Sequence, residues 1–160
     1  MRSVATIGVY GFDVDSFLGA LRRADVGLLL DVRQRRGLRG REYAWANAKR
    51  LRAALADAGI EYAHDPELGT GSELRAVQRR YDEQHGVGQR SRGELAPEFR
   101  ERYVRDVLDR VDLEPIIEEI PADSTTALMC VETDPEACHR SLIAERMAAE
   151  HGVSVTHIRP

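Results

Sequence analysis

Two cysteines, a glutamate and a histidine near the C-terminus form the segment with the most obvious chemical capability. Cys130 and Glu132 follow an apolar run, and Cys138 and His139 come shortly afterwards. Such side chains act as nucleophiles, as general acids and bases, or as ligands of zinc and iron. We predict catalytic roles for Glu132, Cys138 and His139. Cys130 is predicted to contact the ligand.

Arg140 stands next in the chain, and its setting predicts an anion site. Asp134-Pro135 is typical of a helix cap and first-position proline, so we expect a helix from there to about residue 150. Helix N-termini attract anions and lower the pKa of thiols, and an arginine there can bind phosphate through two parallel hydrogen bonds. We therefore predict Arg140 as a ligand contact. A simpler alternative is that Cys138 packs in the core and Arg140 balances nearby acids.

A metal or redox role of the cysteines is a further alternative. The spacing of Cys130, Cys138 and His139 matches no standard zinc finger or ribbon. Neighbouring side chains on a helix also point about 100° apart. We assign no metal ligands from the sequence, and the cofactor stays unknown. A disulfide between the cysteines is feasible across the turn, but reducing surroundings disfavour it.

Polar side chains also end the other predicted strands. Asp31 and Arg33 end the second apolar run, His64 ends the third and Tyr10 ends the first. We predict Asp31 as a catalytic carboxylate, because a carboxylate at a strand end can act as acid, base or nucleophile. Tyr10, Arg33 and His64 are predicted ligand contacts. Alternatively Asp31 only orders the loops through an ion pair with Arg33 or Arg140, of which we favour Arg140.

Alternating strands and helices must position these groups. Apolar runs predict strands at 4–10, 27–32, 60–64, 126–131 and 154–158. Helical patterns cover 13–23, 47–58 and 72–81, and a long helix is expected from 97. The alternation predicts an α/β three-layer sandwich, Rossmann-like and doubly wound, with a largely parallel sheet of about five strands. Such sheets bind ligands beyond the carboxyl ends of their strands, where the polar side chains stand.

Two irregular stretches interrupt this pattern. Residues 33–45 form an arginine-rich loop, with five arginines and no acid from Arg33 to Arg41. We expect it to attract phosphates, with Tyr43 and Trp45 available to stack on a base. The simpler alternative is a solvated loop. Residues 66–95 form an irregular insert and candidate lid.

Three motifs carry a resemblance to a known family: Asp-Val-Arg at 31–33, Pro-Glu-Leu-Gly at 66–69, and Cys130-x-Glu132-x5-Cys138-His139-Arg140. Together they resemble the domain of unknown function 488 family over almost the whole chain. Members often carry a Gly-His-Ser-like turn where this chain has Gly-Val-Tyr-Gly at 8–11. The resemblance implies the fold and the site at the strand ends, and it implies no particular reaction.

Length and composition exclude several classes of protein. The chain has 160 residues, of which 42% are hydrophobic and 31% charged, with two cysteines. These values exclude collagen, low-complexity disorder and a disulfide scaffold. No apolar run approaches the roughly 20 residues of a membrane span, and the first residues lack the apolar core of a signal peptide. We expect a single domain over 1–160, a cytoplasmic location and no membrane partner.

These observations predict an enzyme, a hydrolase or transferase, that acts on a phosphorylated or nucleotide-type substrate at the carboxyl ends of the strands. Its expected partner is a phosphorylated small molecule or a nucleotide. The alternative is a non-catalytic module that binds nucleotides or nucleic acid. A metal or redox protein that uses Cys130 and Cys138 is the third hypothesis. The oligomeric state stays unknown.

Overall fold

The computed structural model describes residues 1–160. Its strands are β1 (Ser3–Ile7), β2 (Val26–Asp31), β3 (Glu61–His64), β4 (Thr125–Met129) and β5 (Ser154–Ile158). Its α-helices are α1 (Val14–Arg23), α2 (Ala48–Asp57), α3 (Ser72–Gln84), α4 (Pro97–Tyr103), α5 (Glu114–Glu118) and α6 (His139–His151). Short 3-10 turns cover Arg41–Ala46 (η1), Pro66–Leu68 (η2) and Pro135–Ala137 (η4), and a π-helical turn covers Val104–Leu108 (η3).

All five strands are parallel and form one sheet in the order β3-β2-β4-β1-β5. Strand β4 is therefore central, and its Ala127 lies opposite Leu29 of β2 and Ala5 of β1. These three residues are at most 1% exposed, since a parallel sheet is covered on both faces. The predicted parallel five-stranded sheet is confirmed.

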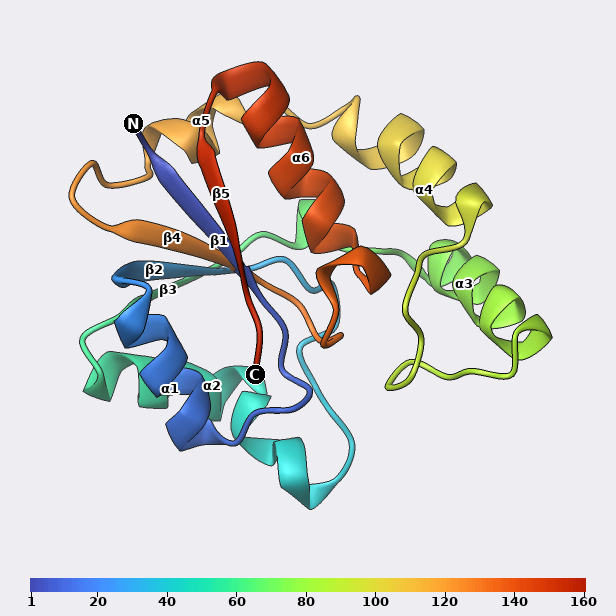
Figure 1. The fold of residues 1–160 in the computed structure, drawn as a ribbon, viewed down its shortest axis with the longest axis horizontal. Coiled ribbons are helices and arrows are strands. Elements are labelled where there is room, and N and C mark those ends of the chain that lie inside the picture. The colour runs from blue at the N-terminus through green and yellow to red at the C-terminus, as the bar shows by residue number, and fades with distance from the viewer.

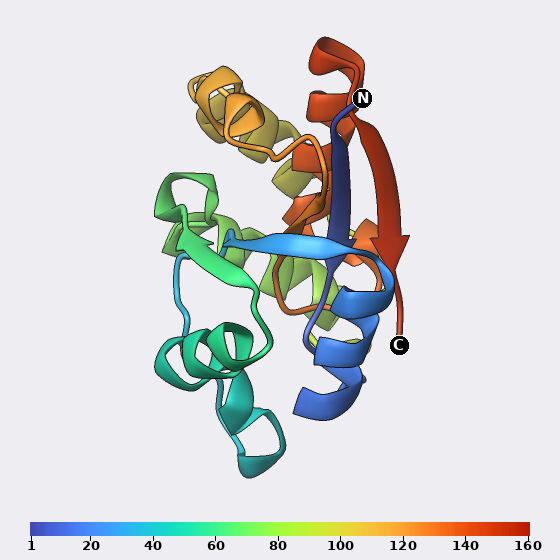
Figure 2. The same ribbon diagram turned by 90° about the vertical axis from the view of Figure 1, so that its left-hand side faces the viewer.

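Helices cover both faces of this sheet (Figure 1). Helices α1 and α2 pack against β2 and β3 on one face, whereas α6 packs against β1, β4 and β5 on the other. Helices α4 and α5 pack against the outside of α6. Figure 2 shows the sheet between the two helical layers. The fold is thus the predicted α/β three-layer sandwich, and none of its helices has the length and apolarity that a membrane crossing requires.

The connections after the strands open a crevice at the end of β4. Strands β1 and β2 flank β4 and lead to α1 and α2 on one face, whereas β4 leads to α6 on the opposite face. Where the connections after two neighbouring strands run to opposite faces of the sheet, a crevice forms between the connections, and a ligand can enter it. This topology places the crevice directly above the polar residues that follow β4.

The helix predicted from Asp134 begins later in the structure. Pro135–Ala137 form only a 3-10 turn, Cys138 is extended (φ −138°, ψ 144°), and α6 starts at His139. The Asp134 carboxylate makes no capping bond and instead pairs with Arg159 at 3.0 Å. The prediction that Cys138 stands in the first turn of a helix is therefore wrong, because it precedes α6 as the N-cap residue.

The irregular stretches contain more structure than the sequence predicted. Turn η1 occupies the second half of the arginine-rich loop, and α3 extends to Gln84 within residues 66–95. The long helix expected from Pro97 is shorter, because α4 passes into the π-helical turn that ends at Leu108. Helix α5 was not predicted from the sequence.

Candidate functional site

A pocket of about 880 Å³ lies at the carboxyl end of β4. Its walls come from the arginine-rich loop, from α3 and the loop that follows α3, and from the turn after β4. Six predicted site residues line it: Tyr10, Arg33, Cys130, Glu132, Cys138 and His139. The other three, Asp31, His64 and Arg140, do not.

Asp31 is fully buried and has no free oxygen. Its Oδ1 accepts from Arg33 Nε at 2.9 Å, and its Oδ2 accepts from Arg33 Nη2 at 2.8 Å and from the Tyr62 hydroxyl at 2.7 Å. His64 Nε2 donates to the Arg33 carbonyl oxygen at 2.7 Å. Asp31 and His64 therefore support Arg33 from behind the pocket. The predicted ion pair of Asp31 with Arg140 is wrong, because Arg33, two residues away, occupies both carboxylate oxygens.

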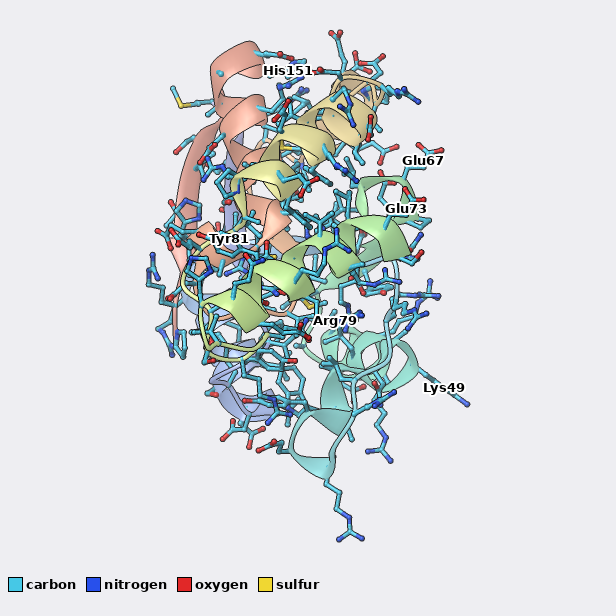
Figure 3. The ribbon with its side chains drawn as sticks, turned by 90° about the vertical axis from the view of Figure 1, so that its right-hand side faces the viewer. Lys49, Glu67, Glu73, Arg79, Tyr81 and His151 are labelled. Atoms are coloured by element: carbon cyan, nitrogen blue, oxygen red, sulfur yellow. The ribbon has the colours of Figure 1, made fainter.

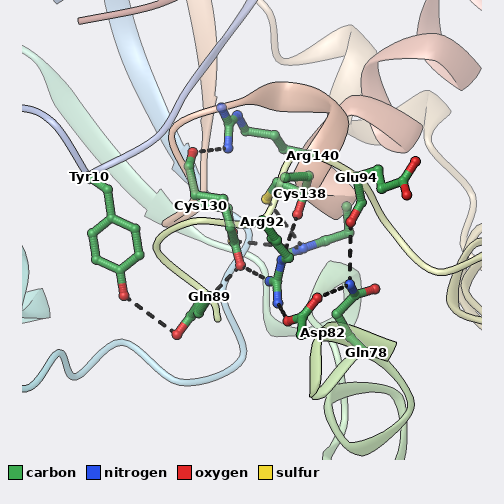
Figure 4. A network of polar contacts seen from close by, with 12 residues as sticks. Tyr10, Gln78, Asp82, Gln89, Arg92, Glu94, Cys130, Cys138 and Arg140 are labelled. Atoms are coloured by element: carbon green, nitrogen blue, oxygen red, sulfur yellow. Dashed lines mark hydrogen bonds and ion pairs between the residues drawn. The ribbon is translucent and has the colours of Figure 1, made fainter. Parts of the chain in front are cut away.

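Arg140 is also fully buried, and it holds the main chain after β4. Its Nη1 donates to the Glu132 carbonyl oxygen at 2.7 Å and its Nη2 donates to the Thr133 carbonyl oxygen at 3.2 Å. Figure 4 shows the guanidinium directed at this backbone. Arg140 supports the turn that carries Glu132, and we do not retain it as a ligand contact.

The Glu132 carboxylate is buried, and only one of its two oxygens accepts hydrogen bonds. Its Oε1 accepts from Arg92 Nη2 and, at 3.3 Å, from Gln89 Nε2, whereas its Oε2 has no hydrogen-bond partner. Burial raises the pKa of Glu132, the nearby Cys138 raises it further, and Arg92 only partly offsets this rise. A buried carboxylate with an unused oxygen in a pocket is typical of a functional group.

Arg92 and its partners in α3 are part of the site that the sequence did not reveal (Figure 4). Arg92 Nη1 donates to Asp82 Oδ2 at 2.9 Å, and Asp82 Oδ1 accepts from Gln78 Nε2 at 2.8 Å. Gln78 Oε1 in turn accepts from the backbone of Ala96 at 2.8 Å. In the sequence these are ordinary polar residues of a charged helix and loop; only the burial of Gln78 and Asp82 and the partial burial of Arg92 distinguish them.

Cys130, Cys138 and His139 meet at the floor of the pocket. His139 Nδ1 lies 3.7 Å from Cys130 Sγ and 3.8 Å from Cys138 Sγ, and its Nε2 donates to the Val32 carbonyl oxygen at 2.9 Å. The imidazole packs edge-on against Tyr103 at 5.3 Å between ring centroids. Both cysteines are free thiols.

The two thiols differ in their affinity for a proton. Burial raises the pKa of Cys138, but the hydrogen bond from Cys130 and the positive charges of Arg140 and His139 outweigh burial, so the pKa falls well below its ordinary value. Donating that same bond, together with burial, raises the pKa of Cys130 well above its ordinary value. Cys130 therefore holds its proton more firmly than Cys138 does.

Four arginines of the pocket have no acidic partner. They are Arg35, Arg39, Arg75 and Arg79. Burial and the charges of Arg35 and Arg79 lower the pKa of Arg75. Figure 3 shows Arg79 on the side of α3 that faces the η1–α2 region. This wall has a surplus of positive charge and suits an anionic ligand.

The aromatic residues of the arginine-rich loop are already packed. Trp45 lies 4.9 Å from the Phe17 ring, and Tyr43 lies 5.0 Å from the Tyr10 ring. The Arg90 guanidinium covers both Tyr10 and Tyr43 at 5.2 Å from each ring. Neighbouring side chains therefore already pack against Tyr43 and Trp45, and their predicted stacking on a base stays untested.

Fold and site together define an α/β sandwich protein with an arginine-lined pocket above a buried cysteine–histidine cluster. The chain belongs to the family described as Domain of unknown function DUF488, whose model matches residues 13–147. This match confirms the resemblance carried by the Asp-Val-Arg and Cys-x-Glu segments. No curated protein and no solved structure matches the chain.

Proposed function

We propose that the protein is an enzyme, a hydrolase or transferase, whose substrate carries phosphate groups that bind in the arginine-lined pocket. The observation that carries this proposal is the set of four pocket arginines without an acidic partner, Arg35, Arg39, Arg75 and Arg79. Like charges this close repel one another, and a phosphorylated ligand relieves the repulsion. Guanidinium groups also match the geometry of phosphate oxygens.

The floor of the pocket supplies groups that suit bond cleavage or transfer. Glu132 presents an oxygen without a protein partner, and Cys138 and His139 lie beside it in the same pocket. A carboxylate in this position can hold or release a proton for a bound substrate. The volume of about 880 Å³ falls within the range of pockets that take nucleotide-sized ligands.

A thermal-shift screen with inorganic phosphate, a sugar phosphate and a nucleotide tests the binding step. A ligand at 100 times its Kd contributes about 2.7 kcal/mol, which raises the Tm of a domain of this size by roughly 5–11 °C. We expect Arg79→Ala to lose this shift. Arg80→Ala is the matched control, because Arg80 is exposed, follows directly in α3 and does not line the pocket. No shift with any phosphorylated compound contradicts the proposal.

The catalytic step is tested with Glu132→Gln and the ligand class that the screen identifies. We expect this variant to keep the thermal shift and to lose turnover, because the amide retains the shape of the side chain but cannot take a proton. Unchanged turnover in Glu132→Gln removes the assigned acid–base role.

A second candidate is a non-catalytic module that binds nucleic acid. It is favoured by Arg35, Arg39 and Arg41, which are exposed, lie on one loop and have no acidic partner. This function predicts binding of DNA or RNA with an affinity that falls steeply with salt, because each phosphate contact releases counterions. It also predicts that Glu132→Gln leaves binding unchanged and that no turnover is found.

A further inference from the structure

The cysteine–histidine cluster at the pocket floor has the dimensions of a metal site. One ligand atom each from Cys130, Cys138 and His139 lie within 4.8 Å of one another. The two nitrogen–sulfur distances are 3.7 and 3.8 Å. In a tetrahedral zinc site, Zn–S and Zn–N bonds of about 2.3 and 2.05 Å place nitrogen and sulfur about 3.6 Å apart. The two sulfurs lie within 4.8 Å of each other, against about 3.8 Å in such a site, so a side-chain adjustment of about 1 Å or less brings all three atoms to bonding distance of one ion.

We propose that Cys130, Cys138 and His139 bind a zinc ion, with the fourth coordination position open to the pocket. All three side chains are buried, and all three line the pocket. Three protein ligands and one open position are typical of catalytic zinc sites, whereas structural zinc sites use four protein ligands. This site does not depend on the nature of the substrate in the arginine-lined pocket.

The histidine is held in the orientation that a metal requires. Its Nε2 donates to the Val32 carbonyl oxygen at 2.9 Å, so Nδ1 is the nitrogen that faces the two sulfurs, and a bound zinc ion would displace the proton that Nδ1 carries beside the Cys138 thiolate. Metal-binding histidines commonly donate their other ring N–H to a carbonyl or carboxylate in this way. The Val32 carbonyl follows β2 directly, so the sheet itself fixes the ring.

The extended backbone at Cys138, just before α6, allows Cys130, Cys138 and His139 to face one another. On one continuous helix, Cys138 and His139 point about 100° apart and cannot share an ion with Cys130. The extended backbone of Cys138 (φ −138°, ψ 144°) instead turns its side chain toward His139 and the end of β4. The spacing in the sequence resembles no zinc motif because the site depends on this local bend.

The unpartnered oxygen of Glu132 gives an independent indication of a ligand at this place. Glu132 is 5% exposed, shares the pocket floor with Cys138, and its Oε2 has no hydrogen-bond partner. A buried carboxylate oxygen normally accepts a hydrogen bond. A water molecule on the open position of the zinc ion would donate to it, and that contact would satisfy the oxygen.

A cobalt titration of the reduced, metal-free and tag-free protein tests the site. Co²⁺ bound by thiolates in a tetrahedral site has strong sulfur-to-cobalt charge-transfer absorption and intense visible bands. The chain has only two cysteines, so such absorption can arise only from Cys130 and Cys138. We expect one Co²⁺ per chain, displaced by Zn²⁺. Absence of binding, or binding without charge-transfer absorption, overturns the proposal.

Variants then test the ligand assignment. We expect Cys138→Ser and His139→Asn each to weaken Co²⁺ and Zn²⁺ binding more than about 100-fold, beyond the loss caused by removing an outer-shell partner. His151→Asn, at the far end of the same helix, should bind as the wild type does. Equal affinity in Cys138→Ser overturns the proposal.

Two further measurements keep the result decisive. If a ligand variant does not fold by circular dichroism, thiol labelling of the wild type decides. Zinc should slow labelling of both cysteines at least about tenfold, and unchanged labelling rates overturn the site. The Arg79→Ala screen is run on metal-free and zinc-loaded protein, so that failure of the anion proposal and failure of the metal proposal are distinguished.

Discussion

The carboxyl ends of β2 and β4 lie side by side, and each places a buried carboxylate against an arginine, but the two pairs differ in what they leave free. Both oxygens of Asp31 are occupied by Arg33 and Tyr62. Glu132 has one oxygen paired with Arg92 and one without a partner. The first pair orders a loop, whereas the second keeps capacity to bind or react. Burial of a carboxylate at a strand end therefore does not by itself distinguish a structural from a functional residue.

The two pairs also differ in how far their partners are separated along the chain. Asp31 and Arg33 are two residues apart, so their pair joins neighbouring residues at the end of β2. Glu132 and Arg92 are 40 residues apart, and their pair closes the loop after α3 over the pocket. The ion pair at β4 therefore joins distant segments, whereas the ion pair at β2 is local.

The largest effect is expected where the Asp31–Arg33 ion pair is broken. Asp31→Asn leaves the buried Arg33 without a counter-charge, which should lower the free energy of unfolding by about 3–5 kcal/mol. For a domain of this size the Tm falls by roughly 6–20 °C. Glu132→Gln should cost much less, because Arg92 keeps its ion pair with Asp82. Urea melts of both variants test the contrast, and equal losses would show that the two pairs are equivalent.

The next effect comes from disturbing the main chain of the β4 site alone. A methyl group added at Gly8 would overlap the Glu132 carbonyl oxygen, which also accepts from Arg140. Gly8→Ala should therefore lower the free energy of unfolding by about 3 kcal/mol, since the neighbouring atom is backbone and cannot easily yield. Gly93→Ala is the control, because its methyl group would meet open space. Equal melts for the two variants would contradict this account.

A smaller effect is expected when Asp31 loses one hydrogen bond but keeps its ion pair with Arg33. Tyr62→Phe removes the 2.7 Å hydrogen bond from the Tyr62 hydroxyl to Asp31 Oδ2 and leaves the bonds from Arg33 in place. A hydrogen bond to a charged group contributes about 1.5 kcal/mol. Thermal melts should show this loss with ligand binding unchanged, because Tyr62 does not line the pocket. A weaker ligand in Tyr62→Phe would mean that the β2 end takes part in binding.

The smallest effect on stability is expected from removing the hydrogen bond that Gln89 donates to Glu132. Gln89 is exposed and donates to Glu132 Oε1 at a long 3.3 Å. Gln89→Ala should change the free energy of unfolding by no more than about 0.5 kcal/mol, as for most surface substitutions. A larger loss in urea melts would show that the loop after α3 is held more firmly than the contacts of Gln89 indicate.

Local patterns in the sequence predicted most of the fold. Apolar runs located all five strands, and the helical pattern over 13–23 located α1, because both signals depend only on neighbouring residues. The strand-end rule also led to Tyr10, Cys130 and Glu132, which line the pocket. The same rule did not separate Asp31 and His64, which lie behind the pocket, from the residues that line it.

The remaining part of the site depended on contacts between distant segments. The sequence by itself determined the five strands, most of the helices, and which chemically capable side chains follow the strands at one edge of the sheet. Only the tertiary structure decided that Arg33 rather than Arg140 pairs with Asp31, and that Arg92 reaches Glu132. It also decided that the chain bends at Cys138, so that both thiols face His139. Periodicity is a property of neighbouring residues, whereas the partner of a buried charge depends on how the layers pack.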